Sequence, residues 1–363
     1  MGKRKNGIIK GVLAAVLFVP AMVHGTLRTQ ASLNVDADCY LTANAETEFQ
    51  KDLEDYRVGS GDSVTDRIVV DYYRIAGITN DEHYDTFTYD LIDGYSLTGY
   101  DISNYDGLSK LESNDWNTIE EQLFGQTLTN DPDVTKNFGE KTDEKEVSTG
   151  LYLMVVHNLE KTKAEDYVKE NTTTAYTEQY VYTFTPQLVS LPSTNEDTRK
   201  EMKTSDGTWI YDLTITLKAE RERRLSSLRI EKLLESYEDS SPVTFVFDIV
   251  GTIDGEPVYS NVTSLTFSDA GLDTALVEGI PVGAHVTVTE VYSGVSYELT
   301  TDAEAETDIL VPVEKGKEPT ADNTATVRFG NEYNGKIPHG HGIKNIFTFS
   351  EKGWAWTEDG GAE

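Results

Sequence analysis

Residues 327–333 read Val-Arg-Phe-Gly-Asn-Glu-Tyr, and their side chains change in character from one position to the next. In an extended strand, residues two apart lie on the same face of the sheet. One face of this stretch therefore carries Val327, Phe329, Asn331 and Tyr333. The pattern predicts a strand whose apolar face includes one carboxamide.

Two other stretches combine the same alternation with one polar residue on the apolar face. In residues 228–234 that residue is Lys232, and in residues 285–291 it is Glu290. An amine, a carboxyl and the carboxamide of Asn331 are thereby predicted to point into a single core. Lysine and glutamate are rarely buried unless they are paired, so this combination calls for a chemical explanation.

Burial in an apolar core favours the neutral forms of these groups, because it lowers the pKa of a lysine and raises the pKa of a glutamate. We predict that neutral Lys232 attacks the side-chain carbonyl of Asn331. Glu290 polarises that carbonyl and shuttles the proton, and ammonia leaves. The product is an isopeptide bond that joins the first and last strands of the domain. Two alternatives remain open: a buried Lys232–Glu290 salt bridge beside a turn asparagine, or a one-residue slip that turns Lys232 to solvent.

The strand signals around this core recur at short intervals, as in a β-sandwich of about seven strands. They lie at residues 228–234, 243–249, 265–267, 285–291, 297–300 and 325–333, with a hairpin turn at Asp254-Gly255. We place this second domain at residues 227–334. It is followed by a tail at residues 335–363 that is predicted to form one hairpin laid against the domain.

The region from residue 31 to residue 217 consists of short β-type runs separated by polar connections, which predicts another β-sandwich. Two segments have helical spacing of apolar residues, at residues 44–56 and 114–125, and are expected to be insertions on the sandwich. Residues 218–226, Lys-Ala-Glu-Arg-Glu-Arg-Arg-Leu-Ser, are predicted to be a charged linker. The predicted fold class is all-β, with two Ig-like sandwiches in tandem.

The charge excludes polyanionic partners, and the N-terminus predicts export. It has 363 residues with 63 Asp and Glu against 31 Lys and Arg, a formal net charge of −32, which repels nucleic acids and anionic membranes. A basic start, an apolar run over residues 8–23 and a small residue at Gly25 predict a secretory signal peptide at residues 1–25. The alternative is an uncleaved anchor, but the run is shorter than the ~20 residues of a spanning helix.

The sequence has no pattern typical of a metal site, a hydrolase or an internal disulfide. His339 and His341 have no third ligand nearby, and no loop follows the calcium-binding EF-hand pattern, so we expect no metal and no cofactor. There is no Gly-x-Ser-x-Gly motif, and we expect no enzymatic activity on an external substrate. The single cysteine, Cys39, cannot form an internal disulfide, and packing is its expected role.

The three strands of the second domain resemble a known family. Residues 229–232, 286–290 and 327–333 resemble the first-strand lysine, the glutamate strand and the closing Phe-x-Asn-x-Tyr of Cna-B-type isopeptide domains. These domains occur in Gram-positive surface proteins and pilins. The resemblance covers residues 227–333 and implies the roles already given to Lys232, Asn331 and Glu290.

The first region resembles the N-terminal domain of sortase-assembled pilins. The similar stretches are residues 70–76, 149–153, 184–192 and 209–214. In that family the last strand runs into a Tyr-Pro-Lys motif whose lysine accepts the next subunit. Here the corresponding residues are Thr216-Leu217-Lys218, so only the lysine matches. The resemblance implies Lys218 as an inter-subunit linkage point, and the alternative is a solvated linker lysine.

These observations predict an exported, extracellular structural protein of a bacterial surface, pilin-like or adhesin-like. Its expected partners are other pilus or surface subunits and host extracellular ligands. The sequence contains no Leu-Pro-x-Thr-Gly sorting signal and no hydrophobic C-terminal run, so its means of attachment is not visible. An alternative is a secreted module that binds host glycans or proteins, with the second domain as a spacer. A secreted enzyme ranks third.

Overall fold

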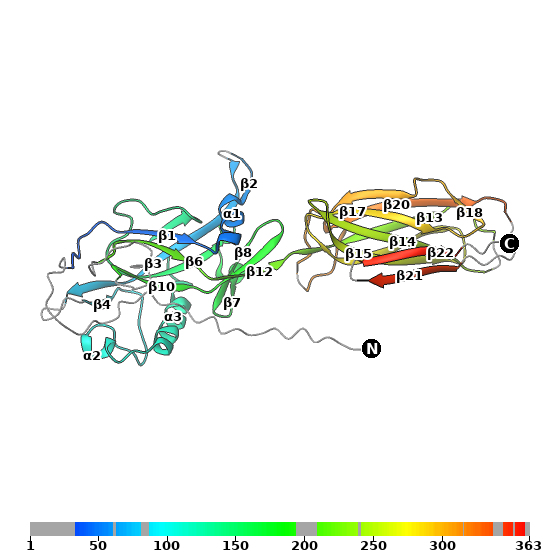
Figure 1. Cartoon of the computed structure of the whole chain (residues 1–363). Coiled ribbons are helices and arrows are strands. Elements are labelled where there is room, and N and C mark those ends of the chain that lie inside the picture. Colours follow the sequence, from blue (N-terminus) through cyan, green and yellow to red (C-terminus); the bar gives the residue numbers. More distant parts are fainter. Residues whose placement is uncertain are drawn as a thin grey trace. The chain divides into compact units, whose positions relative to one another are not determined.

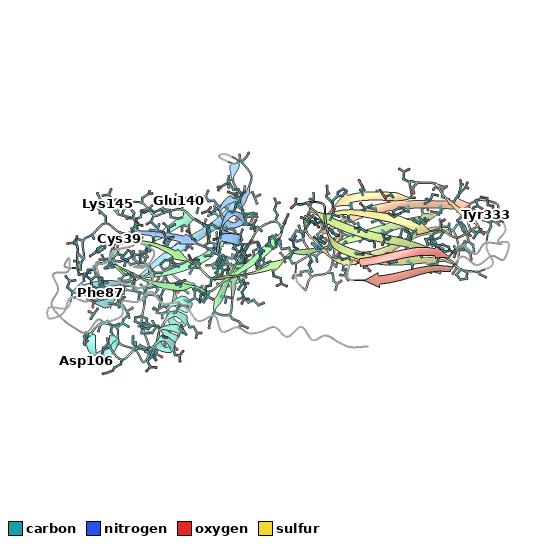
Figure 2. The ribbon with its side chains drawn as sticks, viewed as in Figure 1. Cys39, Phe87, Asp106, Glu140, Lys145 and Tyr333 are labelled. Atoms are coloured by element: carbon teal, nitrogen blue, oxygen red, sulfur yellow. The ribbon has the colours of Figure 1, made fainter. Side chains whose placement is uncertain are left out.

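The structure is a computed structural model, shown in Figure 1. It describes residues 33–60, 63–80, 87–193, 209–238, 241–314, 316–336, 344–350 and 353–359. The predicted signal peptide and the His339/His341 pair lie outside these residues.

The chain divides into two compact units, which are described separately. Unit 1 comprises Met1–Thr177 and Val181–Arg221, and unit 2 comprises Glu178–Tyr180 and Glu222–Glu363. Strands dominate both units among the described residues. The predicted all-β fold class with helical insertions in the first part is confirmed.

Unit 1 contains short helices between its strands. The helices are α1 (Thr47–Asp55), α2 (Tyr105–Leu108), α3 (Ser113–Thr127) and α4 (Ala164–Tyr167). The strands are β1 (Tyr40–Asn44), β2 (Arg57–Val58), β3 (Asp66–Asn80), β4 (Phe87–Leu91), β5 (Val134–Asn137), β6 (Gly150–Asn158), β7 (Val168–Lys169), β8 (Thr172–Tyr176), β9 (Tyr180–Phe184), β10 (Gln187–Leu191), β11 (Asp212–Thr216) and β12 (Ala219–Arg223).

The largest sheet of unit 1 is organised around β3. Its order is β10-β6-β3-β2, and β4 and β5 also pair with β3. A second sheet has the order β12-β9-β8-β7, and β1 forms a separate parallel pair with β11. Every residue of β6 is buried, because the strand lies inside the unit.

The insertion α3 covers the sheet with an apolar stripe. Trp116, Ile119 and Leu123 follow the three-to-four spacing of one helix face and share a core with Leu151 and Leu153 of β6. The sequence predicts a helix over residues 114–125, and the observed α3 agrees with it. Packing of this face therefore holds the insertion on the sandwich.

The residues predicted to be a charged linker contain the boundary between the two units and lie mostly in strands. Within residues 218–226, β12 forms a strand paired with β9, and β13 begins at Leu225. The charged side chains do not reveal strand β12, because its middle is exposed. Glu220 and Glu222 lie in water while the backbone pairs with β9. Hydrophilic composition alone does not distinguish an exposed strand from a linker.

Unit 2 contains ten strands among its described residues. They are β13 (Leu225–Leu234), β14 (Val243–Ile253), β15 (Glu256–Phe267), β16 (Gly271–Pro281), β17 (His285–Tyr292), β18 (Tyr297–Leu299), β19 (Glu304–Asp308), β20 (Thr324–Tyr333), β21 (Lys344–Ser350) and β22 (Gly353–Asp359).

Two four-stranded sheets of unit 2 enclose one core. Their orders are β16-β13-β20-β18 and β15-β14-β17-β19. Alternate residues of the strands face inward, and both sheets contribute to a single cluster that includes Ile230, Phe247, Val288 and Phe329. This is the layered arrangement of a β-sandwich, and Figure 1 shows its strands running side by side.

The predicted hairpin turn at Asp254-Gly255 joins β14 to β15. Both residues have positive φ, 52° and 82°, and the flanking Ile253 and Glu256 are paired. Two-residue turns with positive φ at both positions match the right-handed twist of paired strands, and they favour glycine. The sequence signal and the observed turn agree.

Two strands of unit 2 are not predicted from the sequence. β16 is mostly exposed over residues 271–276, and β19 reads Glu-Ala-Glu-Thr-Asp. Both lie at sheet edges, so they have no continuous apolar face to reveal them. β19 exposes Glu304, Glu306 and Asp308 along this edge.

The C-terminal tail contains a hairpin of β21 and β22. Its register pairs Phe347 with Trp356 and Phe349 with Trp354. β22 lies beside β15, at the edge of the sandwich (Figure 1).

Glu120 anchors α3 to the edge strand β10. Its carboxyl accepts a hydrogen bond from the Leu188 backbone N–H at 3.2 Å, and the residue is 5% exposed. Burial raises the pKa of Glu120 to about 7, although the Leu188 hydrogen bond opposes this. A raised pKa means that unit 1 is most stable below the ordinary carboxyl pKa and loses this stability as the pH rises through about 7.

We expect Glu120→Gln to remove this pH dependence, because the amide keeps an acceptor for Leu188 and never ionises. The free energy of unfolding should rise by about 3 kcal/mol near about pH 8 and stay unchanged near about pH 4. Urea unfolding at the two pH values measures it. Glu144→Gln, at an exposed glutamate of unit 1 that has no part in the Glu120 shift, is the control. Equal gains from both variants would contradict the role of Glu120.

Candidate functional site

The three predicted residues of unit 2 meet in the core between its two sheets. Lys232 lies on β13 and Asn331 on β20, which are parallel neighbours in one sheet. Glu290 lies on β17 in the opposite sheet, paired with Phe247 of β14. Phe329 is the β20 partner of Lys232, so Asn331 lies two positions further along. The long lysine side chain spans this offset.

Hydrogen bonds close a triangle among the three side chains. Lys232 Nζ donates to Glu290 Oε2 at 2.5 Å and also donates to Asn331 Oδ1. Asn331 Nδ2 donates to Glu290 Oε1 at 2.9 Å. Each residue therefore contacts both others.

Water has no access to this triangle. The side chains of Lys232 and Glu290 are 0% exposed, and Asn331 is 0% exposed. The Phe245 ring centroid lies 4.4 Å from Lys232 Nζ, and the Phe247 centroid lies 5.9 Å from it. Phe329 packs on Phe247 with ring centroids 5.2 Å apart, which completes an apolar lining.

The lining changes the acidity of both ionisable groups. Burial lowers the pKa of Lys232, and the hydrogen bond and charge of Glu290 offset only part of this. Burial raises the pKa of Glu290, against the opposing effects of Lys232 and Asn331. Both directions favour an uncharged amine beside an uncharged carboxyl.

This arrangement presents a nucleophile, an acid-base group and an acyl group in contact. A neutral amine has a free electron pair, and its nitrogen lies at the side-chain carbonyl of Asn331. Glu290 contacts that amine with one oxygen and the amide nitrogen with the other. Asn331 hydrogen-bonds Glu290 through its amide nitrogen, whereas the sequence predicts Glu290 at the carbonyl oxygen of Asn331.

The aromatic lining is not identified from the sequence. Phe245 and Phe247 lie two apart on β14 and alternate with half-buried positions, so the parity that locates Lys232 also applies to them. Alternation within β14 shows which of its side chains point inward. It does not show that β14 faces β13 across the core.

Lys218 lies elsewhere, between the end of β11 and the start of β12. It is half-buried, and Leu217 before it donates its backbone N–H to Asn44 O at 2.7 Å. It takes no part in the unit 2 triangle.

In the described part of the chain, no group of three or more His, Cys, Asp or Glu could hold a metal ion. No helix within the same residues is long and apolar enough to cross a membrane.

Comparisons with known proteins give a match for unit 2. A family described as a domain of unknown function, DUF5979, matches residues 228–334. A comparison with curated proteins gives no match.

Among solved structures, the chain is similar to pilins. A streptococcal ancillary pilin is 13% identical, with 89% of this chain and 84% of that chain covered and a TM-score of 0.21. The major pilin from Streptococcus pyogenes is 14% identical, with 83% and 99% covered and a TM-score of 0.20. The Corynebacterium diphtheriae major pilin SpaA is 15% identical, with 73% and 65% covered and a TM-score of 0.24.

We expect Lys232→Met to raise the pKa of Glu290 further when both proteins carry Asn331→Ala, which prevents the isopeptide bond and leaves the amine of Lys232 free. That amine opposes the effect of burial on this carboxyl, and methionine keeps an unbranched side chain while removing this opposing effect. Carbon-13 NMR of the glutamate carboxyls during a pH titration measures it. A fall of the Glu290 pKa toward that of a solvated carboxyl would show that the side chain is not held in the core.

Proposed function

We propose that this chain is an exported structural subunit of a bacterial cell surface, pilin-like in role, whose second unit is closed by a Lys232–Asn331 isopeptide bond. The observation that carries the proposal is the buried triangle of Lys232, Glu290 and Asn331. The chain performs no reaction on an external substrate. Its chemistry is internal and occurs once per molecule.

The reaction follows from the two contacts of Glu290. Nζ of Lys232 attacks Cγ of Asn331, and Glu290 Oε2 receives a proton from Nζ. The Nζ–Cγ bond forms as the Cγ–Nδ2 bond breaks. Glu290 Oε1, 2.9 Å from Nδ2, returns a proton to the leaving nitrogen, which departs as ammonia. Glu290 ends in its starting protonation state.

The geometry favours this reaction over a simple salt bridge. A buried ion pair requires only Lys232 and Glu290, and it is costly unless both partners are charged and fully hydrogen-bonded. Here the pKa of each group is shifted toward its neutral form. The amide of Asn331 contacts both partners, which a salt bridge does not require.

The bond would close a long loop. Lys232 and Asn331 are 99 positions apart, and by the chain-entropy treatment of cross-links a loop of this size contributes about 4 to 5 kcal/mol to the free energy of unfolding. It would also join the first and last strands of the sandwich. Tension between the ends of unit 2 would then pass through a covalent bond.

The surface role rests on this cross-link together with the chain's composition. The basic start and the apolar run support export and an extracellular location. The alternative role as a binding module depends on an exposed aromatic surface on unit 1. Over the described residues, the aromatic side chains of unit 1 are buried or half-buried.

Lys218 is the proposed linkage point to another pilus or surface subunit. Its place directly after β11 supports this role, because β11 is the strand that resembles the one before the pilin lysine. A lysine at the end of a paired strand has a fixed backbone and a side chain that is half-exposed.

The cross-link is tested by the intact mass of the full chain. We expect the parent to be lighter by one ammonia than its processed sequence, and Glu290→Ala to have the full mass. Peptide mapping should join the Lys232 and Asn331 peptides in the parent only.

Glu231→Ala is the matched control, since Glu231 is adjacent to Lys232 but forms its ion pair with Arg328 at 2.7 Å. This variant should lose the same ammonia as the parent. Full mass in the parent, with no joined peptides, would refute the isopeptide bond and leave a buried salt bridge.

The linkage role of Lys218 predicts covalent oligomers in the bacterium that produces the chain. We expect a ladder of bands that resists boiling in detergent, and its loss in Lys218→Arg, because guanidinium is not a nucleophile for acyl transfer. Lys141→Arg, at an exposed lysine of unit 1, is the control. A ladder that persists in Lys218→Arg would assign the linkage to another residue.

A further inference from the structure

Unit 1 closes its fold with the same strand arrangement as unit 2. In unit 1, β1 pairs in parallel with β11, from Tyr40 opposite Asp212 to Asn44 opposite Thr216. In unit 2, β13 pairs in parallel with β20. In each unit a parallel pair thus joins an early strand to a late one.

The inward side chains at these two closures differ. On β1 they are Leu41 and Ala43, and on β11 they are Leu213 and Ile215, each no more than 1% exposed. None of them is an amine, a carboxyl or a carboxamide. The buried face of this closure therefore has no nucleophile and no acyl group, whereas that of unit 2 has both.

Among the described residues of unit 1, no lysine is placed to form a cross-link elsewhere. Within the described residues, Lys232 is the only lysine that is buried. The closest carboxylate to a described lysine of unit 1 is Asp212, 2.5 Å from Lys141 Nζ, but both side chains are exposed and water stabilises both charges. Lys136 Nζ lies 2.8 Å from Asp143 and 2.9 Å from Glu146. These hydrogen bonds raise the pKa of Lys136, so its amine stays protonated and has no electron pair for attack.

We infer that, over the described residues, covalent closure is confined to unit 2, so that tension applied at the two ends of the chain extends unit 1 and leaves unit 2 folded. That unit 2 stays folded rests on the proposed isopeptide bond. The extension of unit 1 depends only on its own apolar closure.

The direction of the load explains how unit 1 resists before it extends. Tension at the start of β1 and the end of β11 pulls two parallel strands past each other along their length. The hydrogen bonds of five residue pairs, and the bond from Leu217 N–H to Asn44 O, must then break together. Unit 1 holds up to a threshold force and then releases its chain in one step.

The released length distinguishes the two units. From the start of β1 at Tyr40 to the end of β11 at Thr216 the chain has about 180 residues, or roughly 600 Å when extended. In unit 2 the bond would hold together two residues 99 positions apart, and the chain between them, roughly 350 Å if extended, would stay closed.

Single-molecule force spectroscopy on the full chain, held at its two ends, tests the inference. We expect the parent to show one extension step of roughly 600 Å. Glu290→Ala should add a second step of roughly 350 Å, because unit 2 then unfolds as well.

Two core variants assign the steps. Ile215→Ala, on β11, should lower the force of the long step without changing its length. Val327→Ala, the matched inward position on β20, should leave the parent trace unchanged, because unit 2 does not open. In Glu290→Ala, Val327→Ala should lower the force of the second step.

The outcomes separate the two claims. A parent chain without the long step would overturn the inference, even if unit 2 stays closed. A parent chain with both steps, identical to Glu290→Ala, would refute the cross-link in unit 2, while its long step would still support an extensible unit 1.

Discussion

Parallel pairing of β13 with β20 is the constraint on which unit 2 depends. Parallel neighbours cannot be joined by a tight turn, so the rest of the sandwich, from β14 to β19, lies between them in the chain. The register of this pair also sets the chemistry, because it offsets Asn331 from Lys232 by the reach of one lysine side chain. A register slip of one residue would turn Lys232 to the outer face and disperse the triangle.

Burying an amine and a carboxyl in an aromatic core opposes folding unless the two groups lose their charges and find hydrogen-bond partners. The cost falls when both are neutral and when every polar atom has a partner, which is the arrangement found around Lys232 and Glu290. Phe245 and Phe247 exclude water and thereby strengthen the hydrogen bonds that orient Asn331. The aromatic lining thus raises the free-energy cost of burying these groups, and it also favours the neutral forms and fixed geometry that the reaction needs.

The sequence identifies the inner strands and the three polar residues, because a period of two is visible wherever one face is apolar. It does not identify β16 and β19, whose side chains are mostly in water, nor β12, whose charges resemble a linker. The sequence also does not predict which side chains meet across the core. The alternation in β14 places Phe247 inward, but only the facing of the two sheets brings its ring near Lys232.

The acidic edge formed by β19 has a consequence for crowding. An open sheet edge offers unpaired backbone groups to any other strand, and charged residues are a common protection against such pairing. Glu304, Glu306 and Asp308 make this edge self-repelling, because two copies brought together would oppose carboxylate to carboxylate. Closely spaced copies of the chain therefore do not pair along this edge. They can be joined only elsewhere on the surface, at sites with specific reactive groups.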